Sequence, residues 1–134
     1  MSISYGYTVI WVPNVEKTVA FYERAFGLTR RFIQTFGPIT WGEMETGATT
    51  LAFSSESEAQ QLFADGFYPN RPNEAPALIL VSLVTEDVTE AYRRALEAGA
   101  TKRDEPKQMP WGQTVARVRD LNGVLVSLAT PAGR

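Results

Sequence analysis

One pattern occurs in both halves of the chain, and this internal repeat restricts the folds open to it. In the first half, VIWVPNVEKTVAFYERAFGL indicates an apolar strand, a cap at Asn14 and a helix that stops at Gly27. In the second half, ALILVSLVTEDVTEAYRRALEAGA indicates a strand, a cap at Asp87 and a helix that stops at Gly99. The apolar stripes of the two helices are Val15, Val19, Tyr22 and Phe26 in the first, and Val88, Ala91, Tyr92, Ala95 and Leu96 in the second. The two halves therefore encode the same structural unit.

Three candidate strands, separated by turn signals, follow each helix. They cover residues 28–36, 39–46 and 49–55 in the first half, and 100–105, 112–120 and 124–130 in the second. Each half is therefore predicted to be a βαβββ module of an α+β fold. We expect one domain over residues 1–134, with a first module at 1–54, a linker at 55–76 that holds a short possible helix at 57–64, and a second module at 77–131.

A curved four-stranded sheet with one helix on its back leaves its other face uncovered. Two such mixed sheets, in one chain or across a homodimer, would form a cup around a cavity, and we expect a homodimer. Side chains alternate between the two faces of a strand, which predicts the residues that face the cavity. They are Tyr5, Tyr7, Val9 and Trp11 on the first strand, Leu80 and Ser82 on the fifth, and Ala52 and Ser127 on the fourth and eighth. The segment NEAPALILVSL is apolar on both faces, which predicts that the fifth strand is central.

Composition excludes several classes of function. The formal net charge of -2 provides no basic surface for nucleic acid. The longest apolar run, at residues 77–84, is too short to span a bilayer, and the start MSISYGYTV lacks the basic and apolar regions of a signal peptide, so we expect a cytoplasmic protein. The chain has no cysteine and no histidine, so an enzyme of this sequence would depend on carboxylates, Lys, Tyr or Ser.

Aromatic residues are the main candidates for a binding site. Tyr5, Tyr7 and Trp11 share one face of the first strand, Trp41 lies on the third, and Trp111 lies in the PWG turn before the seventh. As a set they favour a site that stacks on a flat, partly apolar molecule. The alternative is that several of them are ordinary core or dimer-interface residues.

Charged residues offer a second, weaker signal. Glu43 and Glu45 share the face of Trp41, where they would do acid and base work or receive a cationic ligand. The favoured interpretation is a solvated strand face on which they pair with Arg117 or Arg119. The basic residues near the helix C-termini are expected to do no more than complement the helix dipoles. They are Arg24, Arg30, Arg31, Arg93, Arg94, Lys102 and Arg103.

Over nearly its whole length the chain resembles the vicinal oxygen chelate superfamily, which includes glyoxalase I, extradiol dioxygenases and bleomycin-resistance proteins. Four segments carry the resemblance: VPNVEKTVAFYERAFGL, WGEMETGATTLAF, EDVTEAYRRALEAGA and PWGQTVARVRDLNGVLVSL. The resemblance implies four metal-facing positions, which here are Tyr7, Ala52, Leu80 and Ser127, with Ser127 where a glutamate would stand. None of these is a credible metal ligand, so we expect no metal and no other cofactor.

Two hypotheses follow. The first is a metal-free binding protein, similar to the drug-sequestering members of the family, that captures a small planar or aromatic molecule such as an antibiotic. Its expected ligand-binding residues are Tyr5, Tyr7, Trp11, Trp41, Glu43, Ala52, Leu80, Ser82, Trp111 and Ser127. The second is a lyase, isomerase or dioxygenase of the same architecture that uses Glu43 with Tyr7, or a metal held by atypical ligands.

Overall fold

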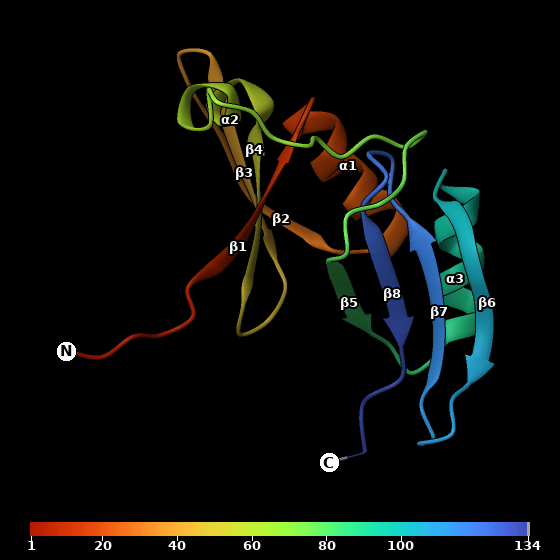
Figure 1. Ribbon diagram of the computed structural model, residues 1–134. Helices are drawn as coiled ribbons and strands as arrows, with labels where there is room; N and C mark the ends of the chain where they lie inside the picture. The colour runs from red at the N-terminus through yellow and green to blue at the C-terminus, as the bar shows by residue number, and fades with distance from the viewer. Residues whose placement is uncertain (134) are drawn as a thin grey trace. The chain divides into compact units, whose positions relative to one another are not determined.

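The computed structural model describes residues 1–133, and within them the βαβββ pattern occurs twice (Figure 1). The first module contains β1 (Tyr7–Val12), α1 (Val15–Phe26), β2 (Thr29–Phe36), β3 (Ile39–Glu45) and β4 (Thr50–Ser55). The second contains β5 (Leu80–Val84), α3 (Val88–Glu97), β6 (Thr101–Gln108), β7 (Thr114–Arg119) and β8 (Leu125–Ala129). Between them lies α2 (Glu56–Leu62), which confirms the short helix predicted in the linker. The expected α+β fold class is confirmed.

Both sheets have the same topology. The strand order is β1-β4-β3-β2 in the first and β5-β8-β7-β6 in the second. In each, the first strand runs parallel to the fourth and the other pairs are antiparallel, so both sheets are mixed. By its contacts the chain divides into two compact units, Met1–Glu23 with Gly27–Pro69, and Arg24–Phe26 with the chain from Asn70 onward.

The predicted caps place both helices. The Asn14 side chain accepts a hydrogen bond from the Lys17 backbone N–H at 2.9 Å, and α1 ends at Gly27, which has a φ of 69°. In the second module the Asp87 side chain accepts from the Glu90 backbone N–H at 3.1 Å. The sequence repeat places these capping signals in both halves of the chain, so an equivalent helix forms in each module.

The core of the first module lies between α1 and its sheet. Val19 and Tyr22 of α1 are fully buried, as are Met44 and Phe53 of the sheet. The rings of Tyr22 and Phe53 are 4.9 Å apart between centroids. At Gly42 a Cβ atom would lie 2.9 Å from Val15 and 3.0 Å from Val19, so the absence of a side chain there lets α1 approach β3. Residues next to Gly42 along β3 therefore point away from α1.

Two strand predictions are wrong. β5 was expected to be central, but it is an edge strand, and its apolar residues Leu80 and Val84 are exposed. β6 is longer than expected and continues through Pro106. Its pairing with β7 is irregular between Asp104 and Lys107, and β6 is an edge strand, where a proline costs no ladder hydrogen bond.

Within residues 1–133, no helix combines the length and the apolar character needed to cross a membrane.

Candidate ligand-binding site

The face of the first sheet that points away from α1 carries most of the predicted site residues. Strand register defines this distal face, because residues directly opposite each other on neighbouring strands share a face. Trp11 and Trp41 both lie opposite Ser54, Val9 and Glu43 both lie opposite Ala52, and Tyr7 lies opposite Thr50. The distal face therefore comprises Tyr7, Val9, Trp11, Trp41, Glu43, Thr50, Ala52 and Ser54.

Three rings, those of Tyr7, Trp11 and Trp41, form an aromatic platform on the distal face. Tyr7 meets Trp41 edge to face, with ring centroids 5.8 Å apart and an angle of 86° between the planes. Trp11 and Trp41 stand on the strands that flank β4, so their Cα atoms are roughly 10 Å apart, twice the spacing of neighbouring strands. Ala52 is fully buried, whereas all three platform rings are partly exposed. The sheet thus presents rings, and not its small residues, to solvent.

An ion-pair network fixes Trp41. The Trp41 indole N–H donates to Glu43 Oε2 at 2.9 Å, and Arg31 Nη1 donates to Glu43 Oε1 at 3.0 Å. Arg31 also donates through Nε to Glu45 at 2.6 Å and through Nη1 to Thr50 at 3.0 Å. The hydrogen bond from Arg31 lowers the pKa of the Glu45 carboxyl below its ordinary value. Trp41 is therefore held in one orientation by a charge network of its own sheet.

The partner of the two glutamates differs from the prediction. Glu43 and Glu45 pair with Arg31, whereas Arg117 pairs with Asp104 in the second module. Arg31 lies in β2 where the register with β3 shifts, between Arg30 and Phe32. Arg31 is the extra residue at this shift, and its side chain reaches the carboxylates of Glu43 and Glu45, so the expectation that Arg31 only complements a helix dipole is wrong.

Helix α2 closes one end of the distal face. Glu58 Oε1 accepts hydrogen bonds from the Trp11 indole N–H and from the Ser54 hydroxyl, both at 3.0 Å. Phe63, which follows α2, meets Trp11 edge to face at 5.6 Å between centroids. Glu58 is not among the site residues predicted from the sequence, because residues 55–76 are expected to form a linker. The sequence gives one signal for Glu58, which is the short possible helix after the fourth strand. In the structure this helix directs the Glu58 carboxylate toward the sheet.

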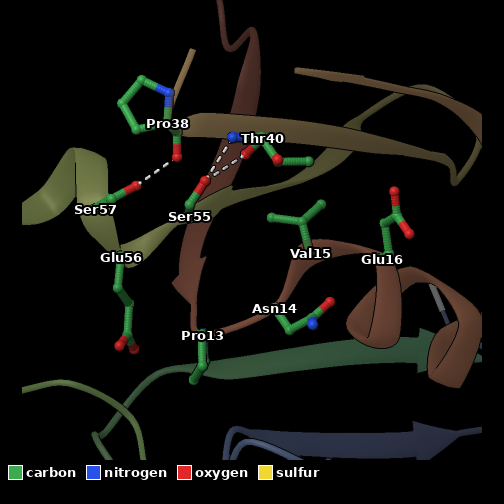
Figure 2. Close-up of a pocket in the computed structure, with 9 residues that line it drawn as sticks. All are labelled: Pro13, Asn14, Val15, Glu16, Pro38, Thr40, Ser55, Glu56 and Ser57. Atoms are coloured by element: carbon green, nitrogen blue, oxygen red, sulfur yellow. Dashed lines mark hydrogen bonds between the residues drawn. The ribbon is translucent and has the colours of Figure 1, made fainter. Parts of the chain in front are cut away.

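A hollow of about 480 Å³ lies at the start of α2 (Figure 2). The Ser55 hydroxyl accepts from the Thr40 backbone N–H at 2.6 Å and donates to the Thr40 carbonyl at 3.1 Å. The Ser57 hydroxyl donates to the Pro38 carbonyl at 2.9 Å. None of the predicted site residues lines this hollow, and its hydroxyls attach the first turn of α2 to the β2–β3 hairpin.

In the second module, the predicted residues on β5 and β8 come together. Ser82 and Ser127 are opposite each other in register, and the Ser127 hydroxyl donates to that of Ser82 at 2.8 Å. Ser127 is 2% exposed, so its hydroxyl serves this pair within the sheet. Leu80 lies next to them on the same face and is half exposed.

Arg119 attaches the segment before β5 to the second sheet. Its guanidinium donates to the carbonyls of Arg71, Pro72, Glu74 and Gly123 at 2.7 to 3.3 Å. The guanidinium of Arg119 thus binds carbonyls of its own compact unit, and not the glutamates with which it was expected to pair.

Two predicted residues lie outside these clusters. Tyr5 precedes β1, is exposed, and shares a hydrogen bond with the Thr8 hydroxyl. Trp111 lies in the turn between β6 and β7, is 67% exposed, and donates its indole N–H to Gln113 at 2.8 Å.

The positions at which the family resemblance implies metal ligands do not fit a metal ion. Ala52 and Leu80 have no donor atom, and the Ser127 hydroxyl is engaged with Ser82. Of the four positions, Tyr7 offers only its phenol oxygen as a metal ligand. In the part of the chain that the structure describes, no group of three or more His, Cys, Asp or Glu side chains is placed to hold a metal ion.

Paired βαβββ modules, each with a helix on one face of its sheet, define the class of protein. The sequence matches the family model of the Glyoxalase/Bleomycin resistance protein/Dioxygenase superfamily over residues 4–128, and the chain belongs to this superfamily. No curated protein matches the sequence significantly.

Solved structures from the same superfamily superimpose over almost the whole chain. A superfamily member from Sphaerobacter thermophilus is 26% identical, with a TM-score of 0.75 and coverage of 97% of this chain and 98% of that one. A glyoxalase-related enzyme from Fulvimarina pelagi is 17% identical, with a TM-score of 0.76 and coverage of 96% and 88%. A family enzyme from Burkholderia phytofirmans is 20% identical, with a TM-score of 0.71 and coverage of 93% and 96%. The last two likenesses show the shared fold.

Proposed function

We propose that the chain is a binding protein that captures a small planar or aromatic molecule on the aromatic platform and holds it without metal. The observation that carries the proposal is the pair of tryptophans, each fixed by a carboxylate, on the face of the first sheet opposite α1. Glu43 holds Trp41 at 2.9 Å and Glu58 holds Trp11 at 3.0 Å. Rings that are already oriented lose little conformational freedom when a ligand binds.

A flat ligand suits the spacing of the platform. The Trp11 and Trp41 backbones are separated by one strand, so a ring system laid across β4 would reach both indoles. Aromatic faces supply apolar contact area, and the exposed Tyr7 ring extends the platform toward the start of β1. The proposed ligand is therefore a planar molecule of several fused rings, as in antibiotic sequestration.

The hydrogen bonds of the Glu43 carboxylate favour a binding role over catalysis. Both of its carboxylate oxygens accept hydrogen bonds, one from Arg31 and one from Trp41. A general base must lie within hydrogen-bond reach of the proton that it abstracts, and the structure directs both oxygens of Glu43 to partners in its own sheet. Glu43 is thus engaged in positioning Trp41, which supports a binding role over the alternative of a lyase or isomerase that uses Glu43 with Tyr7.

The proposal keeps the cytoplasmic homodimer expected from the sequence. Apolar side chains at and before the β5 edge are exposed, which supports an interface with a second copy. They are Leu78, Ile79, Leu80 and Val84.

We expect Trp41→Ala and Trp11→Ala each to weaken binding of the planar dye proflavine about tenfold, because each removes one stacking surface. Quenching of tryptophan fluorescence measures the affinity, and calorimetric titration measures it again for each variant. The control is Tyr68→Ala, which removes a fully exposed aromatic ring outside the platform and should leave the affinity unchanged. Equal affinities for all four proteins would contradict the proposal.

A further inference from the structure

Helix α2 is held in place at both ends, and this gives its second glutamate, Glu58, a defined position. Ser55 and Ser57 bind the backbone at Thr40 and Pro38, as Figure 2 shows. At the other end Phe63, which caps α2, packs against Trp11. Glu58, the third residue of α2, therefore stands on a helix that is anchored to the first sheet at both ends.

Glu58 uses this position to orient Trp11. One carboxylate oxygen, Oε1, accepts from both the Trp11 indole and the Ser54 hydroxyl at 3.0 Å. Ser54 is fully buried, so its hydroxyl ties the carboxylate to the sheet beneath the platform. The indole plane of Trp11 is fixed by this bond and by the edge of Phe63.

The charge of Glu58 is not neutralised within the described residues. Glu43 and Glu45 share Arg31, whereas no Lys or Arg among residues 1–133 forms an ion pair with Glu58. Its second oxygen, Oε2, makes no hydrogen bond to any residue that the structure describes. A negative charge with a free acceptor thus stands at the edge of the platform beside an indole.

Resting on the proposed function, we propose that Glu58 is a positioning residue that also selects the ligand, and that it favours a planar molecule with a positive charge. A cation over or beside the Trp11 ring would be attracted both by the ring face and by the Glu58 carboxylate. A neutral planar molecule would gain only the stacking surface. The carboxylate expected from the sequence to receive a cation, Glu43, is already paired with Arg31.

The experiment compares three planar three-ring probes: proflavine, which is cationic, lumichrome, which is neutral, and anthraquinone sulfonate, which is anionic. We expect the unchanged protein to bind proflavine more tightly than lumichrome, and lumichrome more tightly than the sulfonate. Glu58→Gln keeps an acceptor for Trp11 and removes the charge. It should lower the ratio of proflavine affinity to lumichrome affinity roughly three- to tenfold.

Two further variants separate charge from position. Glu58→Ala removes the acceptor as well, so it should weaken both probes and move the NMR signal of the Trp11 indole N–H, which Glu58→Gln should restore toward its original position. Glu16→Gln removes the same charge from α1, which covers the opposite face of the sheet, and should leave the preference intact.

The outcomes distinguish the two proposals. If the probes bind and Glu58→Gln leaves the ratio of proflavine to lumichrome affinity unchanged, the selection by Glu58 is wrong and the binding platform stands. If none of the probes binds, the proposed function fails, and the role of Glu58 fails with it.

Discussion

Replacing Gly123 by alanine is expected to destabilise the protein by about 3 kcal/mol, through backbone strain and a steric clash together. Gly123 has a φ of 90°, in the left-handed region that costs an L residue roughly 1–2 kcal/mol. A Cβ atom there would lie 2.4 Å from the Arg71 carbonyl oxygen. That carbonyl also accepts from Arg119 at 3.0 Å, so relief of the clash would disturb the attachment of the segment before β5.

Gly47 provides the matched control for this prediction. Its φ is 92°, nearly the same as that of Gly123, but a Cβ atom there would have nothing within 4 Å. Gly47→Ala should therefore cost only the backbone strain, roughly 1–2 kcal/mol. Urea unfolding measures both free energies, and equal losses for the two variants would show that the close approach of Arg71 to Gly123 has no energetic weight.

Phe53→Ala is expected to cost roughly 3–5 kcal/mol of unfolding free energy, because it opens a cavity in the centre of the first module. Phe53 is fully buried in β4, and its ring lies 4.9 Å from that of Tyr22 on α1. Both the transfer free energy of the ring and its packing against α1 are lost.

The control for the cavity is Phe36→Ala on β2. Phe36 is 61% exposed, so its removal should change the unfolding free energy by less than about 1 kcal/mol. Thermal and urea unfolding should rank the two variants in this order. A loss at Phe53 no greater than the loss at Phe36 would mean that α1 does not pack on β4 as the structure shows.

Local signals made most of the fold predictable. Asn14 and Asp87 hydrogen-bond to the first turns of their helices, and Gly27 ends α1 in the left-handed conformation. Such signals act over a few residues and occur twice in the sequence, so the module could be read from them. Alternation along β1 likewise predicted that Tyr7 and Trp11 share a face with Ala52.

Long-range geometry limited the site prediction. Arg31 of β2 reaches Glu43 and Glu45 of β3, and this pairing depends on strand order and register, which local sequence signals do not determine. Glu58 meets Trp11 across 47 positions of sequence, through a helix expected only as part of a linker. Strand order also depends on pairing, so the apolar character of β5 predicted a central strand where an edge strand lies.

If the platform of Tyr7, Trp11 and Trp41 binds a planar molecule, the indole N–H signals of the tryptophans should report the binding. Heteronuclear NMR would follow the three tryptophan indoles as proflavine is added to the intact chain. We expect saturable shifts for Trp11 and Trp41 with a common affinity, because each N–H is fixed beside the platform by Glu58 or Glu43. Saturable binding that leaves both of these signals in place, or moves only that of Trp111, would contradict this expectation.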